Sequence, residues 1–590
     1  MINKPLPIWK YLAHLIRYAW GSYLLNLLLW LLLVVGPSLA TGLIIRAIFD
    51  TLTNSAPLTI GLVGLMTLLV VTAVVEMGIL IVSEASNILL RLNVSSLLRR
   101  NLFAHLLQQP GAKPLPESPS EAISRFRDDI KTVENLVSST ANPIGQLVFI
   151  VVAVVVMIRI NLLLTLVVFL PLLAMLLIAS AARHRLQRYH EARQVATGQV
   201  TGFIGEMFGA IQAIKVNTAE TAVLHQFGKL NAERGKTAVK DHTFTALLNA
   251  LTGNTVSLGT GIILLLAAQS MANGRFSVGD FALFVIYLRV MTHNTDWVGY
   301  SIAFYRQSDI AFARLQTLMG NAPPEKLVEP APIYLRQPVP LPKFPQKQAA
   351  DRLEHFSARQ LSYRFGHSEN GIFDIDLEVP RGSFTVITGR VGSGKTTLLR
   401  LLLGLLPLDA GELHWNGRLL TNPDRFLVPP RCAYTPQVPR LFSDTLRDNI
   451  LLGVSEGDVD WDRVLETAVF TPDIATLEKG LDTTIGPRGV KLSGGQIQRA
   501  AAARMLVRQP ELFVVDDLSS ALDVETERLL WSRLTAKSNS TFIVVSHRRA
   551  VLQQADQVLV LQNGRLLDSG PLNDLLTRCS EMQQLWHEGQ

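Results

Sequence analysis

Cysteine is nearly absent from this chain of 590 residues, which holds only two, Cys432 and Cys579. Such a count provides no disulfide framework and no cysteine metal site, and a reducing cytosol is expected around the part that holds both. Charged residues are also scarce, at 17%, whereas hydrophobic residues reach 48%. This balance is typical of a protein that is part membrane and part soluble.

Two further features are missing. No basic stripe with interleaved aromatic residues occurs, so the net charge of +7 does not indicate a nucleic-acid partner. The first residues are not followed by a short apolar run with a small-residue cleavage site, so we expect no removed signal peptide. The chain is too long for a single core, and two or more domains are expected.

The apolar residues gather before about residue 310, in six stretches long enough to cross a hydrocarbon core of about 30 Å. A helix at 6–18 either lies in the membrane interface or extends the first span. Long hydrophilic insertions follow the second and fourth spans, and a very short turn must join the third to the fourth. Both insertions are rich in Arg and Lys, which places them and both termini in the cytoplasm. The six spans lie near 20–47, 58–83, 141–159, 161–182, 244–270 and 279–303.

The chain changes character after the last span. Residues 321–350 are rich in proline and predict an extended linker. Beyond them, short β-branched strands alternate with helical segments, which is the pattern of an α/β domain. We therefore predict a transmembrane domain over 1–320 and a separate α/β domain over 351–590.

A complete phosphate-loop motif, G-x-x-x-x-G-K-[ST], lies between a buried-strand pattern at 383–388 and an apolar helix pattern at 395–404. Glycines let backbone N–H groups converge on phosphate oxygens, and the helix N-terminus adds a favourable dipole. Lys395 is expected to neutralise the β- and γ-phosphates, and Thr396 to ligate Mg²⁺. The residues predicted to contact ATP here are Gly389, Arg390, Val391, Gly392, Ser393, Gly394, Lys395, Thr396 and Thr397.

A second nucleotide signal follows later in the chain. The apolar strand pattern at 512–515 delivers Asp516 at its C-terminal end, where a carboxylate can hold Mg²⁺ through its water shell. ATP and Mg²⁺ are therefore the expected cofactors. Shortly before this strand stands the pentapeptide Leu492-Ser493-Gly494-Gly495-Gln496.

With these motifs the chain resembles the ATP-binding-cassette family, and its six spans make it similar to an exporter-type half-transporter over essentially its whole length. The resemblance implies a bundle of six transmembrane helices plus an α/β P-loop NTPase domain, with ATP hydrolysis coupled to transport. It also implies short coupling helices at the tips of the insertions, which we place near 117–122 and 219–226.

The resemblance assigns roles to further residues. Gln437 matches the family's Gln loop, which touches Mg²⁺ and the attacking water, and His547 matches the switch histidine that senses the γ-phosphate. Residues 520–523 match the loop through which two nucleotide domains meet. The residues Ser493, Gly494, Gly495 and Gln496 would clamp ATP held by a second nucleotide domain, so one chain is half of a dimer. An aromatic residue before the phosphate loop stacks on adenine; Phe365 is our choice and Tyr363 its rival, because alternation places both on one strand face.

One position departs from the family. The general base is usually Glu, and this chain has Asp517 there, one methylene shorter. Its oxygen falls roughly 1 Å short, a misplacement that can cost about 10²-fold in rate. Since paired chains of the family often include one such irregular site beside an intact LSGGQ, we favour a heterodimer over a homodimer.

The last predicted span carries Arg289, His293, Asp296 and Tyr300 on one helical face. They either line the transport path or pair internally to hold helices together. The leading function is export of a lipid, peptide or small amphipathic molecule, in a bacterial inner membrane. The alternatives are a weakly hydrolysing regulatory half, a nucleotide-gated channel and an importer subunit. A soluble member of the family is disfavoured by the six spans.

Overall fold

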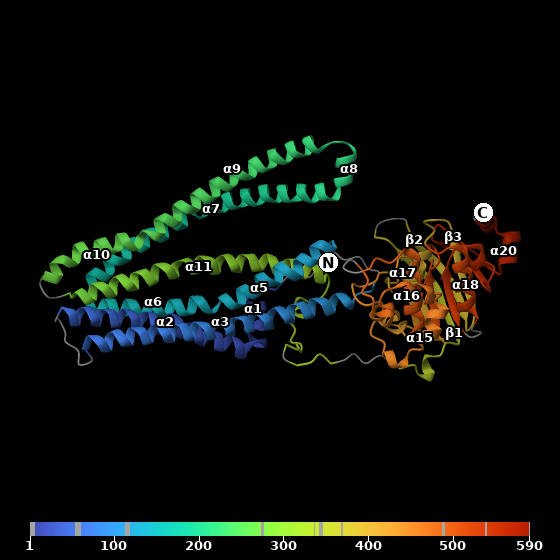
Figure 1. The fold of residues 1–590 in the computed structure, drawn as a ribbon, viewed down its shortest axis with the longest axis horizontal. Coiled ribbons are helices and arrows are strands. Elements are labelled where there is room, and N and C mark those ends of the chain that lie inside the picture. The colour runs from blue at the N-terminus through green and yellow to red at the C-terminus, as the bar shows by residue number, and fades with distance from the viewer. Residues whose placement is uncertain are drawn as a thin grey trace. The chain divides into compact units, whose positions relative to one another are not determined.

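The computed structural model divides the chain into two compact units (Figure 1). The membrane unit comprises Met1–Ala104 and Pro116–Leu335, and the nucleotide unit comprises His105–Leu115 and Arg336–Gln590. The division falls inside the segment predicted as a linker. The structure describes all residues except 1–5, 54–60, 112–117, 273–275, 336, 341–345, 367–369, 487–489, 537–539 and 589–590.

The membrane unit is built of helices, and the described parts of all six predicted spans lie on them (Figure 1). The fifth predicted span is divided between two helices. Three stretches, Trp20–Leu52, Gly61–Leu107 and Glu121–Ile160, are long and apolar enough to cross a membrane by length and composition. The helices are α1 Ile8–Tyr18, α2 Trp20–Leu52, α3 Gly61–Leu107, α4 Pro119–Ser124, α5 Ile130–Ser139, α6 Ala141–Ile160, α7 Leu162–Gly209, α8 Ile211–Val216, α9 Glu220–Gly253, α10 Thr255–Ala272 and α11 Val278–Met319.

The predicted short turn between the third and fourth spans is confirmed at Asn161. Its backbone is extended, with φ −156° and ψ 109°, and its side chain accepts a hydrogen bond from the backbone N–H of Leu164 at 3.0 Å. An Asn at this position satisfies one of the N–H groups that have no partner at a helix start. One residue therefore ends α6 and begins α7.

Close packing joins α2 to α11. The fully buried Tyr287 donates its hydroxyl hydrogen to the carbonyl oxygen of Leu39 at 3.1 Å. Gly42 makes room for the ring, because a Cβ there would stand 2.3 Å from a ring carbon. Near the ends of the same helices, Arg46 Nε lies 2.8 Å from Asp280 Oδ1. Asp280 is 6% exposed, and the guanidinium of Arg46 gives this buried carboxylate an opposite charge.

The second hydrophilic insertion forms a long helical hairpin, in which α7 and α9 run side by side and α8 joins them (Figure 1). Our placement of a coupling helix at 219–226 is wrong, because the short helix is Ile211–Val216 and α9 already begins at Glu220. Thr218, with φ +50°, makes the bend between them. In the first insertion the short helix α4, Pro119–Ser124, overlaps the predicted 117–122.

The segment predicted as an extended linker is not extended throughout. Pro324–Val328 forms a 3₁₀ helix in which Leu327 and Val328 are fully buried. The side-chain amide of Asn101, on α3, donates hydrogen bonds to the carbonyl oxygens of Leu327 at 3.1 Å and Glu329 at 2.8 Å. The first part of the linker therefore belongs to the fold of the membrane unit.

The polar face predicted on the last span lies on α11. Arg289 is exposed on this helix. The side chains of His293, Asp296 and Tyr300 lie outside the described residues, so both interpretations of this face stay predictions.

The nucleotide unit contains two sheets. A six-stranded sheet has the order β10-β9-β3-β8-β7-β6, with parallel pairing from β9 to β6, and an antiparallel sheet has the order β2-β1-β4-β5. This α/β architecture confirms the predicted fold class. The strands are β1 His355–Arg364, β2 Gly371–Pro380, β3 Phe384–Gly389, β4 Ala410–Trp415, β5 Arg418–Leu419, β6 Cys432–Thr435, β7 Leu512–Asp516, β8 Thr541–Val545, β9 Gln557–Gln562 and β10 Arg565–Gly570.

The central strands of the six-stranded sheet are buried on both faces. Alternate residues of one strand enter different hydrophobic clusters, as Val386 and Ile387 do on β3. Strands covered on both faces are mostly apolar, and β3, β7 and β8 are buried at every residue. The helices are α12 Lys395–Leu402, α13 Pro423–Phe426, α14 Leu446–Leu451, α15 Trp461–Thr467, α16 Thr471–Thr476, α17 Gly494–Leu506, α18 Val524–Thr535, α19 Arg549–Leu552, α20 Leu572–Arg578 and α21 Ser580–Glu588.

Candidate nucleotide-binding site

The phosphate loop connects β3 to α12, as its motif predicts. Gly389 ends the strand with φ +146°, and a Cβ there would stand 2.3 Å from the carbonyl oxygen of Leu561 on β9. Gly394, with φ +103°, precedes the helix, and a Cβ there would stand 2.7 Å from Ile372. Both positions therefore require glycine for its backbone conformation, and Gly389 also requires it for space, because the atom that it would meet is backbone. The neighbouring strands β9 and β2 therefore pack directly against the two ends of the loop.

Lys395 folds back over this loop. Its Nζ donates hydrogen bonds to the carbonyl oxygens of Gly389 at 2.7 Å and Arg390 at 2.8 Å. Burial lowers the pKa of Lys395, and the carboxylates of Asp516 and Asp517 oppose that shift. The ammonium group is thus held by neutral oxygens beside two acidic residues, where a phosphate oxygen would be a stronger partner.

Thr396 and Asp516 meet beside the loop. The hydroxyl of Thr396 donates a hydrogen bond to Asp516 Oδ1 at 3.2 Å, and Asp516 is 2% exposed. Burial raises the pKa of Asp516, partly offset by the hydrogen bond from Thr396 and by Arg400. A buried carboxylate and a hydroxyl form an oxygen-only donor set, which fits Mg²⁺ bound through few protein ligands.

Asp517 adopts a left-handed backbone conformation, with φ +50°. Its backbone N–H donates to the carbonyl oxygen of Val545 at 3.0 Å. The residue is 7% exposed, and its Oδ1 is buried with no hydrogen-bond partner among the described residues. A buried carboxylate oxygen without a donor is costly, and such groups mark sites that act on a ligand or water.

The strand order brings the predicted site residues to one edge of the sheet. The phosphate loop follows β3, His547 follows β8, Asp516 ends β7 and Gln437 follows β6, and these strands are successive neighbours. Ligands of open parallel sheets bind at the carboxyl ends of the strands. Gln437 and His547 are both exposed to solvent.

The pentapeptide 492–496 opens the helix α17. Ser493 is its N-cap and forms a capping box with Gln496, while Ser493 and Gly494 are exposed. A helix start has four backbone N–H groups without an intrahelical partner, of which the capping box satisfies that of Gln496 here. The helix dipole adds positive potential, so this end favours an anion. Gln498, on the same helix, donates to the hydroxyl of Ser520 at 2.7 Å and accepts from the backbone N–H of Ala521 at 3.0 Å.

The two aromatic candidates for adenine contact each other. The rings of Tyr363 and Phe365 lie 4.9 Å apart in an edge-on arrangement. Tyr363 packs against the core, whereas Phe365 is 44% exposed. The geometry therefore favours Phe365 for stacking on a base, with Tyr363 as its support.

Comparison with known proteins identifies the family. Residues 24–294 match the ABC transporter transmembrane region, and residues 372–520 match the ABC transporter family of ATP-binding domains. This chain is an ABC transporter. Its membrane and ATP-binding parts are fused in one chain, which is the organisation of the exporter type.

Several curated ABC transporters are similar in sequence. A β-(1→2)glucan export ATP-binding/permease protein of Bartonella bacilliformis is 30% identical over 64% of this chain and 61% of its own length. ATP-binding cassette sub-family B member 6 of Rattus norvegicus is 30% identical over 58% of this chain and 40% of its own length. The match therefore spans less than two thirds of these relatives. A Staphylococcus aureus protein, provisionally named a multidrug export ATP-binding/permease protein, is 26% identical over 83% of each chain.

A solved structure has the same fold over nearly the whole chain. It is a bacterial Atm1-family ABC exporter with ATP bound, with a TM-score of 0.73 and 22% identity, and the match covers 97% of this chain and 98% of that one.

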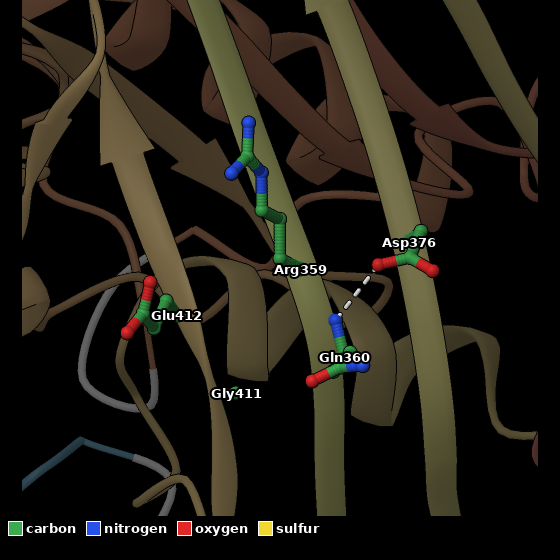
Figure 2. A pocket seen from close by; sticks show the side chains of 5 residues that line it. All are labelled: Arg359, Gln360, Asp376, Gly411 and Glu412. Atoms are coloured by element: carbon green, nitrogen blue, oxygen red, sulfur yellow. Dashed lines mark hydrogen bonds between the residues drawn. The ribbon is translucent and has the colours of Figure 1, made fainter.

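A polar hollow of about 440 Å³ lies on the antiparallel sheet and is lined by Arg359, Gln360, Asp376, Gly411 and Glu412 (Figure 2). Strand β1 bulges here, with Gln360 at φ +50° and its N–H donated to Asp376 Oδ1 at 2.8 Å. Gly411 lets the bulge approach, because a Cβ there would stand 2.5 Å from the carbonyl oxygen of Gln360. The bulge accounts for the hollow, which contains none of the predicted site residues.

The sequence analysis did not predict two contacts that hold site residues in place. Gln498 ties the pentapeptide's helix to the loop at 520–523, and a polar side chain on an apolar helix face was the available signal. Arg390 contacts Glu581 on the C-terminal helix, 191 positions away, and no local pattern indicates such a pair.

Proposed function

We propose that this ABC transporter is one half of a dimeric ATP-driven exporter that moves a lipid, peptide or small amphipathic molecule out of the cytoplasm. One observation carries the proposal. The phosphate loop, His547, Asp516 and Gln437 meet at the carboxyl edge of one parallel sheet, in the same chain as a helical membrane unit. When a nucleotide site and a membrane unit are fused in one chain, the reaction at the site is best explained as the energy source for transport across the membrane.

In this proposal the phosphate loop binds the triphosphate and Lys395 moves its ammonium from the loop carbonyls to the β- and γ-phosphates. Thr396 and Asp516 hold Mg²⁺, with Gln437 as a further ligand. The metal, when bound, neutralises charge between the β- and γ-phosphates. Phe365 stacks on the adenine and sets the depth at which the triphosphate lies.

Hydrolysis needs a base and an oriented water. We assign the base to Asp517, whose unpartnered Oδ1 can accept the proton of an attacking water. His547 and Gln437 then orient the γ-phosphate and the water from the neighbouring loops. The shorter side chain of Asp517 predicts slow turnover in this site.

The exposed start of α17 supports the dimer. Ser493 and Gly494 face solvent and favour an anion, which in our proposal is the γ-phosphate held by the partner chain. Gly495 and Gln496 complete that contact. We favour a different chain as the partner, because Asp517 is irregular while the pentapeptide is intact. The second candidate function is that of a weakly hydrolysing, regulatory half of a dimer, and the irregular Asp517 supports this function too.

The proposed location is the inner membrane of a bacterium, with both termini and the nucleotide unit in the cytoplasm, in agreement with the basic insertions. The identity of the transported molecule stays open, since two of the relatives named above are described as exporters of different substrates.

Two experiments test this function. Inside-out vesicles that contain the chain should accumulate an amphipathic dye only with ATP, and uptake equal to that of empty vesicles for every dye and peptide tried would refute export. Asp517→Ala and Ser493→Arg distinguish the dimers by ATP turnover. In a heterodimer Asp517→Ala leaves most turnover and Ser493→Arg abolishes it, whereas in a homodimer both abolish it.

A further inference from the structure

The C-terminal helix α21 contacts the first variable residue of the phosphate loop. Arg390 Nε donates a hydrogen bond to Glu581 Oε1 at 2.6 Å, and another guanidinium nitrogen donates to Gln584. Gln562, at the end of β9, donates to the second carboxylate oxygen of Glu581 at 3.2 Å. The Glu581 side chain is 6% exposed, so its charge depends on these donors.

This contact continues to Lys395. The carbonyl oxygens of Gly389 and Arg390 accept the two hydrogen bonds from Lys395 Nζ, at 2.7 and 2.8 Å. The side chain of Arg390 is therefore fixed by α21 while its main chain holds the phosphate-binding lysine. A shift of residue 390 displaces the oxygens from which Lys395 must move to reach a phosphate.

Helix α21 is itself anchored at a second point. Met582 is fully buried in the core of the nucleotide unit. Arg549 donates from Nε to the carbonyl oxygen of Trp586 at 3.0 Å, and its guanidinium lies 4.8 Å from the centre of the Trp586 ring. These contacts hold α21 in place, and with it the position of Glu581 beside the phosphate loop. Arg549, which makes one of the contacts, lies two residues after His547 in the sequence.

We propose that Glu581 is a positioning residue for nucleotide binding, which holds Arg390 so that the phosphate loop is preorganised for ATP. The inference rests on the proposed ATP-binding function. A purely structural role is the rival. The Arg390 side chain is 54% exposed, and ion pairs with an exposed partner contribute little to folding stability. A preorganised loop, by contrast, loses less freedom on binding and binds more tightly.

The test is equilibrium binding of a fluorescent ATP analogue to the purified full chain, with KM and kcat of ATP hydrolysis measured beside it. Glu581→Ala should raise the dissociation constant and the KM by up to about tenfold, the factor expected when ordering the loop on binding costs as much free energy as one charge-assisted hydrogen bond supplies. The kcat and the thermal midpoint should change little. Asp568→Ala is the matched control, because it removes a similar pair with Arg578, at 2.9 Å, from the neighbouring helix α20. It should leave binding unchanged.

A double-mutant cycle separates positioning from structure. In the Arg390→Ala background, Glu581→Ala should have no further effect on affinity, because the interaction is already gone. An additive loss, unchanged affinity in the single variant, or tighter binding from a released Arg390 would each overturn the inference. A parallel loss of thermal midpoint and affinity in Glu581→Ala would assign the residue to folding and also overturn it. Failure of the wild-type chain itself to bind the analogue would refute the proposed function instead.

Discussion

Replacing Asp517 by Glu should increase the rate of ATP hydrolysis. Asp517 directly follows the buried strand β7 in a left-handed conformation, with φ +50°, and its backbone N–H is bonded to Val545, so a backbone shift that brings the carboxylate closer would break this contact. One added methylene extends the reach by roughly 1 Å, and a misplacement of that size costs about 10²-fold in rate. A hundredfold change equals about 2.7 kcal/mol of activation free energy. We therefore expect kcat of the chain assayed without a partner chain, where residue 517 supplies the base in every site, to rise between about tenfold and about 10²-fold.

The substitution also has a structural cost. A non-glycine residue pays roughly 1–2 kcal/mol in the left-handed region, and Asp tolerates it better than Glu does. The thermal midpoint should therefore fall slightly while kcat rises and KM stays constant. Asp374→Glu is the matched control, because Asp374 is exposed on β2 with φ +54°. It reproduces the backbone cost without touching the site.

The assay is phosphate release from the purified chain in liposomes at saturating MgATP, for the wild type, Asp517→Glu and Asp374→Glu. If Asp517→Glu turns over at the wild-type rate or below it, the reach of this carboxylate does not limit hydrolysis. The assignment of Asp517 as the base, and the preference for a heterodimer built on it, would then lose their support.

Other predictions follow from single contacts. Asp516→Asn keeps the acceptor for Thr396 but removes a buried charge. Burial raises the folded-state pKa of Asp516, so its ionised form costs stability once pH rises above the unfolded value. At pH 7 Asp516→Asn should therefore raise the thermal midpoint of the nucleotide unit while Mg²⁺-dependent turnover is lost. A lower thermal midpoint would contradict this. Chelation of Mg²⁺ by EDTA should abolish turnover, and adding Mg²⁺ should restore it. Asn101→Ala removes both hydrogen bonds to Leu327 and Glu329, and limited proteolysis should then cut near residue 328 faster than in the wild type; an unchanged cleavage rate would show that apolar burial alone holds the segment.

Much of the nucleotide site followed from the sequence because its parts are local. A glycine loop between a strand pattern and a helix pattern fixes where Lys395 and Thr396 lie. Asp516 ends another strand pattern, and parallel strands gather their carboxyl ends at one edge. These steps need only periodicity and motif spacing, so strand order was the one piece that the structure had to supply.

The parts that sequence reasoning missed depend on distant contacts or on subtle breaks. The pair of Arg390 and Glu581 joins segments with no shared pattern. The sequences of residues 211–216 and of the start of α9 are both typical of a helix, so periodicity does not show where one helix ends and the next begins. In the structure the bend at Thr218 separates them. Prolines between 323 and 332 suggested an extended chain, yet the apolar pair Leu327 and Val328 is buried. Apolar residues inside a proline-rich segment were the signal for packing there.

ATP hydrolysis by the purified, liposome-reconstituted chain tests the central claim most directly, with the wild type compared to Lys395→Ala. We predict Mg²⁺-dependent turnover in the wild type, alone or with its partner chain. In Lys395→Ala we predict loss of nearly all of that activity from the altered site, because the phosphate charge is no longer neutralised. Equal turnover in the two proteins would contradict the nucleotide site on which the proposed exporter depends.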